Sequence, residues 1–437
     1  MGHYLTSNDA PAVPVPLRGL KREIFFRSRP ARYVGDGLRS VPLEKTLFNI
    51  EGFFLASDVE VQFEMVKRPA DDTMRSVLEN LSSQHKPGDK RYFGKGMSGE
   101  QTLASACMEL VERFAAGMRS DDLLHEASYA EMASEARDPR LFRLYPETAF
   151  DPDKKIDWVW GYSLTGSIPV LVPANLVFFP YEADDNDKII SPTDSNGIAS
   201  GNNIEEAVLH GILELVERDA VMISEWNRLP VLKILPDILD TKVERTVQIL
   251  KAKGFSCLFS SVPSDHPIPV ISTFLQHKED AANCSVAFGC HLDPSLAMFR
   301  ALTEAVQLLP PSANHEEWLN SGSAKRYVAA DAGTKPLSGF KSLVSGDLKK
   351  NIETCVRLLK GIGVEIMVVD LSLPDIPFSV VRVLATGLQP VIYESEMRLS
   401  ERFFNIPVKL GLRNKPLDPA DVKICPLCGY RTLERGH

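Results

Sequence analysis

Apolar residues recur at helical spacing in several separate stretches of the chain, and each of these stretches predicts a helix. Between them lie short runs rich in β-branched and aromatic residues, which predict strands. The predicted helices cover 99–118, 204–227, 294–309 and 346–362, and a further one begins near Ser40–Pro42. The predicted strands cover 257–262, 268–275, 284–290, 364–370 and 380–384, with two more within 157–181. Strands interleaved with helices indicate a mixed α/β (α+β) fold with mixed sheets.

The polar stretches divide the chain. Residues 1–22 are rich in proline and lack apolar periodicity, so we expect an N-terminal tail. Residues 23–412 hold the predicted elements and form the expected domain, and 413–437 are expected to be a C-terminal tail. Within the domain, 66–90 are polar with one short helical stretch and are interpreted as a loop-rich insertion. A loop over 191–203 leads into the helix at 204.

Composition narrows the class of protein. No apolar run reaches the roughly 20 residues of a membrane helix, and the first residues lack the pattern of a signal peptide. Seven cysteines in 437 residues are few and odd in number, which favours free thiols and a cytoplasmic location. A net charge of −9 disfavours a general nucleic-acid binder. We therefore expect no membrane and no nucleic-acid partner.

Candidate chemistry lies on the faces of three predicted helices. Residues spaced by three or four along a helix share one face, and here such faces carry glutamates beside arginines. On the first helix these residues are Ser105, Glu109, Glu112 and Arg113; on the second they are Glu206, His210, Glu214, Glu217 and Arg218; on the third they are Arg300, Glu304 and Gln307. Each of the first two sets falls within an arc of roughly 100–120° at 3.6 residues per turn. The first two helices both contain Glu-x-x-Glu-Arg.

Glutamates on one face repel each other unless a cation lies between them. Mg²⁺ binds through a few carboxylates together with substrate phosphates, and arginine grips phosphate in a bidentate manner. The faces therefore suit an Mg²⁺-nucleotide cleft. The alternative is a solvated surface with local ion pairs, which is the usual meaning of a single such motif. Two copies and a third helix favour the cleft.

These residues resemble the motifs of the YcaO superfamily, and within it the azoline-forming (thiazole/oxazole) cyclodehydratases of the D type. The matching segments are Ser105-x-x-x-Glu109-x-x-Glu112-Arg113 after Gly94-Lys95-Gly96, the loop Asp194–Asn202 followed by Glu206, His210, Glu214 and Glu217-Arg218, and Arg300-Ala-x-x-Glu304-Ala-x-Gln307. Arg39 with Pro42, Glu44 and Thr46 resembles the segment that opens the domain, so the resemblance spans roughly residues 30–412.

The resemblance implies a YcaO-type fold whose acidic helix faces build an Mg-ATP cleft. It implies that Glu109, Glu112, Glu214 and Glu217 hold Mg²⁺ and are catalytic. It implies that a second set contacts ATP or orients its ligands: Lys95, Ser105, Arg113, Glu206, His210, Arg218, Arg300, Glu304 and Gln307. His210 is equally open to interpretation as a buried structural histidine.

The activity implied is ATP-dependent O-phosphorylation of a backbone amide in a ribosomally made precursor peptide, giving thiazoline or oxazoline rings. One alternative is a YcaO-type thioamide synthetase with a sulfur-delivery partner. Another is a non-catalytic, nucleotide-binding accessory subunit. Because no N-terminal module for a leader peptide is evident, we expect a separate leader-binding or sulfur-delivery protein, and the family favours a homodimer.

The C-terminal tail departs from the azoline-forming pattern. Those members often end in a proline-rich segment, whereas this chain has Cys425-Pro-Leu-Cys428-Gly. Such a knuckle supplies two zinc ligands, and a structural Zn²⁺ needs four. Free thiols are therefore favoured over Zn²⁺ at Cys425 and Cys428. The departure favours the thioamide alternative modestly.

Overall fold

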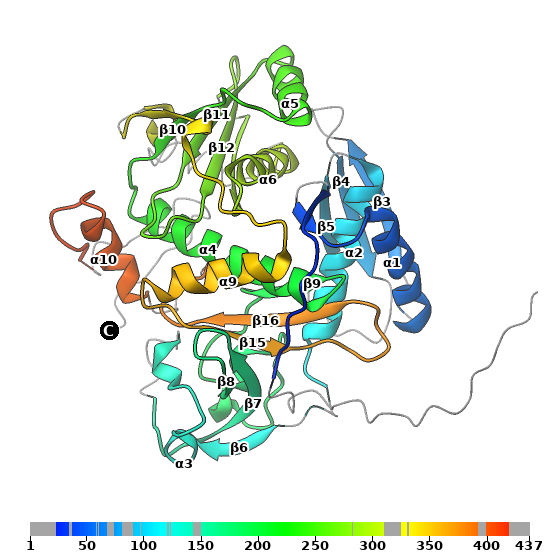
Figure 1. Ribbon diagram of the computed structural model, residues 1–437, viewed down its shortest axis with the longest axis vertical. Helices are drawn as coiled ribbons and strands as arrows, with labels where there is room; N and C mark the ends of the chain where they lie inside the picture. Colours follow the sequence, from blue (N-terminus) through cyan, green and yellow to red (C-terminus); the bar gives the residue numbers. More distant parts are fainter. Residues whose placement is uncertain are drawn as a thin grey trace, which may run out of the picture.

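The structure is a computed structural model of the 437-residue chain. It describes residues 23–34, 37–57, 59, 61–67, 74–80, 91–96, 98–119, 122, 124–142, 150–281, 283–309, 325–329, 332–391 and 399–418. The described strands form four sheets, of six, five, three and two strands, surrounded by helices (Figure 1). The expectation of a mixed α/β fold with mixed sheets is confirmed.

The six-stranded sheet forms the lower part of the molecule in Figure 1. Its strands, in spatial order, are β6 (His125–Ser128), β7 (Lys155–Ser163), β15 (Ile366–Asp370), β16 (Ser379–Ala385) and β9 (Ile198–Gly201), and β8 (Ile168–Pro173) also pairs with β7. All of these pairings are antiparallel. The strands predicted at 364–370 and 380–384 and within 157–181 are confirmed.

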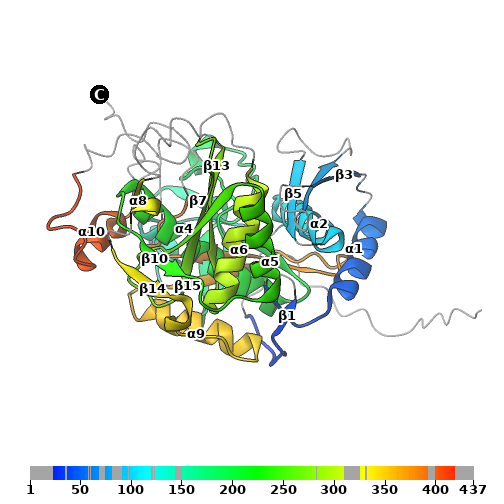
Figure 2. The ribbon, with the colours of Figure 1, turned by 90° about the horizontal axis from the view of Figure 1, so that it is seen from above.

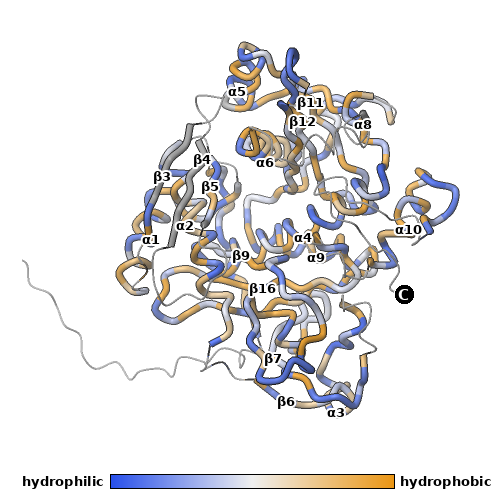
Figure 3. The backbone as a smooth tube through the Cα atoms, turned by 180° about the vertical axis from the view of Figure 1, so that it is seen from behind, coloured by the Kyte–Doolittle hydropathy of each residue, from blue (hydrophilic) through white to orange (hydrophobic). Residues whose placement is uncertain are grey.

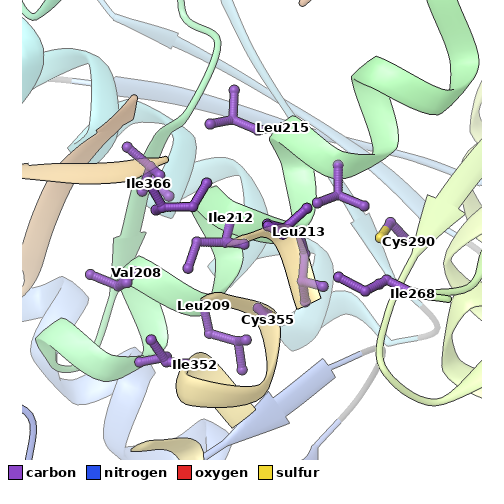
Figure 4. Packing of buried hydrophobic residues seen from close by; sticks show 14 of the residues in the cluster. Val208, Leu209, Ile212, Leu213, Leu215, Ile268, Cys290, Ile352, Cys355 and Ile366 are labelled. Atoms are coloured by element: carbon purple, nitrogen blue, oxygen red, sulfur yellow. The ribbon is translucent and has the colours of Figure 1, made fainter. Parts of the chain in front are cut away.

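Both faces of β15 and β16 are covered. Val368 and Val383 point into a core shared with α4 (Ile204–Trp226) and α9 (Leu348–Lys360). The alternate residues Met367 and Val369 point into a second core with α2 (Gly99–Ala116). This two-residue alternation is the geometry of a pleated strand, and continuous apolar runs arise because both faces are buried. Figure 4 shows the first core, where Ile212 of α4, Ile352 of α9 and Ile366 of β15 meet.

The five-stranded sheet lies above α4 in Figure 1. Its order is β13 (Cys284–Cys290), β12 (Val270–His277), β11 (Phe255–Ser261), β10 (Leu232–Leu235) and β14 (Thr334–Pro336), and only β10–β14 is parallel. α6 (Pro294–Gln307) and α5 (Thr241–Ala252) pack against it through one apolar cluster. Long stretches of α6 carry the orange of hydrophobic residues in Figure 3. The strands predicted at 257–262, 268–275 and 284–290 and the helix at 294–309 are confirmed to within a few residues.

The interpretation of residues 66–90 as a loop-rich insertion with a short helix is wrong. This segment contains β4 (Met74–Asn80), which pairs with β3 (Val61–Lys67) and β5 (Arg91–Gly96) in an antiparallel sheet. The sheet packs on α2 beside α1 (Leu43–Ser57), as Figure 2 shows from above. β4 (MRSVLEN) mixes charged and polar residues with apolar ones, so it lacks the continuous apolar run that identified the central strands.

Shorter elements complete the described chain. They are β1 (Arg32–Val34), β2 (Gly37–Arg39), α3 (Tyr129–Met132), α8 (Lys325–Val328), α10 (Glu401–Lys409) and the 3₁₀ turns η1 (Pro139–Leu141), η2 (Ala174–Leu176), η3 (Asn186–Lys188) and η4 (Leu337–Gly339). Within the described ranges, no helix is both long and apolar enough to cross a lipid bilayer. The N-terminal tail expected at 1–22 lies outside the described residues, and so do residues 419–437 of the C-terminal tail expected at 413–437, with the zinc hypothesis for Cys425 and Cys428.

Candidate active site

The glutamates of α2 are held by backbone groups of neighbouring strands. α2 begins at Ser98, whose hydroxyl accepts a hydrogen bond from the N–H of Gln101. Glu109 accepts a hydrogen bond from the N–H of Phe93 on β5 (2.8 Å). Glu112 accepts two from Ser200 on β9, from its N–H (3.0 Å) and its hydroxyl (2.9 Å). Each carboxylate thereby keeps a fixed orientation.

The glutamates of α4 are held in the same way. Glu214 accepts a hydrogen bond from the N–H of Gly197 (2.7 Å) and forms an ion pair with Arg218 one turn later (2.7 Å). Arg218 also donates to Asn196 Oδ1 (2.6 Å). Glu217 accepts a hydrogen bond from the N–H of Cys290, at the end of β13 (2.8 Å). The helix therefore joins the six-stranded and five-stranded sheets through its acidic residues.

A cavity of about 410 Å³ lies between these helices, and we call it the acidic cavity. Ten residues singled out from the sequence line it: Lys95, Ser105, Glu109, Glu112, Arg113, Glu206, His210, Glu214, Arg218 and Arg300. The three helix faces and the Gly94-Lys95-Gly96 segment thus converge, although up to about 200 residues of sequence separate them. His210 is only half-buried at this wall, which argues against a fully buried structural histidine.

Glu217, Glu304 and Gln307 do not line the acidic cavity. Glu304 forms an ion pair with Lys95, which does line it. Burial and the charge of Glu304 raise the pKa of Glu217, while Arg300, Lys95 and Arg218 act in the opposite direction. Glu217 and Glu304 therefore belong to one charge network with the cavity. Gln307, at the end of α6, is not part of the cavity wall.

The environment of Glu112 disfavours its charged form. Burial, followed by the charges of Glu214 and Glu109, raises its pKa to about 7. Among the residues that the structure describes, no group of three His, Cys, Asp or Glu side chains is arranged to hold a metal ion by itself. Mg²⁺ needs no such cage, because it keeps waters and takes one or two carboxylates with substrate phosphates. A cation beside Glu112 would relieve the repulsion that raises this pKa, so the residues fit Mg²⁺.

Glu206 has a different environment from the other predicted ligands. It is 3% exposed, and its two oxygens accept four hydrogen bonds from the backbone N–H and side chains of Ser40 and Asn202, at 2.7–3.1 Å. The preceding Glu205 similarly binds Arg27 N–H (2.6 Å) and Arg29 Nε (2.8 Å). These two residues anchor the N-terminal segment to α4. The sequence contained no signal for Glu205, because its partners are more than 170 residues away.

Several residues of the cavity wall were not identified individually from the sequence. Ser200, Gln101 and Phe93 are among them. Ser200 lies in the loop and strand that resemble the YcaO pattern, so that resemblance was the available signal. Gly197 has φ +80°, and a Cβ there would lie 2.2 Å from the Val383 oxygen. Only glycine allows this turn, which aims the Gly197 N–H at Glu214.

The chain matches the sequence model of a known protein family. A model of the YcaO cyclodehydratase family, described as ATP- and Mg²⁺-binding, matches residues 93–389. The matching model thus describes a class of ATP- and Mg²⁺-binding enzymes. The chain belongs to the YcaO family, as its motifs indicated.

Three similar proteins illustrate the range of that family. An uncharacterised protein of Methanothermobacter thermautotrophicus is 28% identical over 68% of this chain and 81% of its own length. The structure of YcaO from Methanopyrus kandleri, bound with AMPPCP and Mg²⁺, has a TM-score of 0.67 and 26% identity, covering 82% of this chain and 94% of that one. A heterocyclase in complex with substrate and cofactor has the same fold, with a TM-score of 0.80 at 24% identity. That match covers 92% of this chain, which spans 58% of the heterocyclase.

Proposed function

We propose that this chain activates a backbone amide of a ribosomally made precursor peptide with ATP and converts it into a thiazoline or oxazoline. The acidic cavity carries this proposal. It gathers carboxylates from two helices beside Arg113, Arg218, Arg300 and Lys95, which is the donor set for a metal-bound polyphosphate. Family membership supports ATP and Mg²⁺ as cofactors. When bound, they would supply the phosphoryl group and a counter-charge for its transfer.

In this proposal each side chain of the cavity has a role. Glu109, Glu112, Glu214 and Glu217 hold Mg²⁺. Ser105, Arg113, His210 and Arg218 contact the nucleotide at the cavity wall, and Lys95, Arg300 and Glu304 balance charge around Glu217. Glu206 and Gln307 support the site from outside the nucleotide, because Glu206 has all four hydrogen bonds to protein groups and Gln307 is outside the wall.

The partners follow from the reaction. The substrate is a precursor peptide, and a separate protein delivers either its leader or, in a thioamide-forming enzyme, sulfur. Membership of a family described as cyclodehydratases supports a substrate that loses water. A homodimer of this chain is the assembly that we expect.

The test combines nucleotide binding with product mass. Calorimetry with AMPPCP and Mg²⁺ should show one site per chain, and binding should be lost when EDTA removes Mg²⁺. Glu217→Gln should abolish ATP consumption, whereas Glu353→Gln, at an exposed position of α9, should leave it unchanged. With candidate precursor peptides, a ring-forming enzyme removes one water per ring, and a thioamide synthetase exchanges oxygen for sulfur. Nucleotide binding without ATP consumption in any mixture would instead indicate an accessory subunit.

A further inference from the structure

A second cavity of about 710 Å³ lies against the acidic cavity, and we call it the neighbouring cavity. Consecutive residues of one loop alternate between the two: Asp194 and Asn196 line the neighbouring cavity, and Ser195 lines the acidic one. On α4, Leu215 faces the neighbouring cavity and Glu214 the acidic one. The two cavities therefore share a wall that is one residue thick.

Arginines hold this wall from both sides. From the acidic cavity, Arg218 donates to Asn196 Oδ1 (2.6 Å). From the neighbouring cavity, Arg382 donates to Asp194 at its carboxylate (2.9 Å) and its backbone oxygen (2.7 Å). Both guanidiniums make charge-assisted hydrogen bonds, which are stronger than neutral ones. The wall thus keeps a fixed position between the two compartments.

The charges of the neighbouring cavity do not suit a second nucleotide. Its three arginines are already paired: Arg140 with Asp138, Arg382 with Asp194, and Arg402 with Asp219 and Asp265. A polyphosphate would gain no uncompensated positive charge there. Much of the remaining wall is uncharged, as at Phe142, Leu384 and Thr386. Its volume lies within the 300–1,000 Å³ typical of ligand sites. Because its arginines are paired and much of its wall is uncharged, an uncharged ligand fits this cavity best.

The carboxyl end of β16 offers this ligand the main-chain groups of Ala385. β9 pairs with β16 only from Ser379 to Arg382, and the N–H of Val383 then donates to the Gly197 oxygen on that side. Alternate residues of a strand direct their main-chain groups to the same side. The main-chain N–H and C=O of Ala385 therefore also point away from β15, as those of Val383 do. No strand in the described part of the chain pairs with Ala385 on that side, and Ala385 lines the neighbouring cavity, half-buried.

We propose that the neighbouring cavity binds the substrate peptide as an extended, uncharged segment that adds to the edge of β16 at Ala385. This inference rests on the proposed function, because it assigns the second reactant of the same site. Main-chain hydrogen bonds would supply affinity for any sequence, as in other cases of strand addition. The thin wall would then set a peptide amide beside the nucleotide compartment. Charged side chains next to the reacting amide are disfavoured, because the wall arginines are already neutralised.

The experiment captures weakly bound peptides by disulfide exchange. Glu401→Cys places a thiol at the wall of the neighbouring cavity, and Glu353→Cys, at an exposed position of α9, is the matched control. Both are made in a chain carrying Cys425→Ser and Cys428→Ser. The probes are capped cysteine-bearing hexapeptides whose other side chains are neutral or carry aspartate or lysine, offered at a fixed thiol concentration.

We expect the cavity thiol to capture the neutral peptides more than the control thiol does, and more than it captures the charged ones. Ala385→Pro removes the N–H donor and should lower capture about fivefold, the value of one hydrogen bond near 1 kcal/mol. Ala385→Ser retains the donor and should leave capture unchanged. Should Ala385→Pro fail to fold, peptides with N-methylated backbones serve instead, and their capture should fall similarly.

Three results would overturn the proposal: equal capture by the two thiols, capture that persists with N-methylated peptides or with Ala385→Pro, or capture that ATP competes away. The last would assign the cavity to nucleotide. Calorimetry with AMPPCP and Mg²⁺ on the same proteins separates the two proposals. Loss of nucleotide binding contradicts the proposed function, and peptide capture reports on the neighbouring cavity alone.

Discussion

Replacing Glu112 by glutamine should make the nucleotide-free protein more stable and at the same time inactive. The pKa of Glu112 is about 7 in the folded chain, because of burial and the charges of Glu214 and Glu109, and about 4.5 when unperturbed. Ionising it therefore costs the folded state about 3 kcal/mol above pH 7. Water around this half-buried side chain screens part of that, so we expect about 2 kcal/mol.

The sign follows from the direction of the pKa change. The folded-state pKa of this acid is raised, so the penalty is absent below about pH 4.5, grows with pH, and is complete above about pH 7. Glutamine has no charge to ionise, and its oxygen can still accept the two hydrogen bonds from Ser200. The advantage of Glu112→Gln should thus be about 2 kcal/mol at pH 8 and below about 1 kcal/mol at pH 5.

The assay is urea unfolding at both pH values, in EDTA without nucleotide, with Glu353→Gln, at an exposed position of α9, as the control. Adding ATP and Mg²⁺ should stabilise the wild-type protein and have little effect on Glu112→Gln, because ligand binding to the folded state adds to stability. The reasoning would be refuted by a variant no more stable than wild type at pH 8, or by an advantage that does not change between the two pH values.

Three other predictions test the framework around the site. Arg402 and Lys409 lower the pKa of Asp265 to about 2, which stabilises the folded state above pH 4, and this stabilisation is lost as the pH falls toward 2. Asp265→Asn should therefore lower the free energy of unfolding, measured by denaturation curves, by about 2 kcal/mol at pH 7 and by about half of that at pH 3. Gly197→Ala should lower the melting temperature and raise KM for ATP, since a Cβ would meet the Val383 oxygen at 2.2 Å; a variant that matches wild type in both would contradict the strained turn. Burial raises the pKa of the Cys107 thiol to about 12, so iodoacetamide at pH 8 should label it only after unfolding, as peptide mass mapping can check.

Much of the core could be predicted because both faces of its elements are buried. Val364–Asp370 and 284–290 are apolar runs that match β15 and β13, and the faces of α2 and α4 repeat at helical spacing. The strand β4 escaped prediction because its sequence, MRSVLEN, mixes charged and polar residues with apolar ones and its composition resembles a loop. A continuous apolar run predicts a strand that is buried on both faces, and a strand without such a run is harder to predict.

The sequence predicts the separate helix faces of the candidate site. It does not predict how these faces come together in one cavity. Local spacing relates Glu109 to Glu112, but nothing local relates Glu112 to Ser200, 88 positions away. Glu206 shows the same limit. Its place on the acidic arc suggested nucleotide contact, whereas its hydrogen bonds go to Ser40 and Asn202. The partners that decide whether a carboxylate binds ligand or backbone come from other parts of the chain.

The anchoring of the N-terminal segment by Glu205 also sets an order of events during synthesis. Arg27 lies 178 positions before its partner Glu205. At 5–20 residues per second, a ribosome needs roughly 10–35 s to make the helix that receives this segment. During that time Arg27 and Arg29 have emerged without their partner. A nascent chain stalled before residue 204 should therefore be cleaved by trypsin after Arg27, and a completed chain should be cleaved there more slowly; Arg29 precedes Pro30, so the bond after it resists trypsin in both chains.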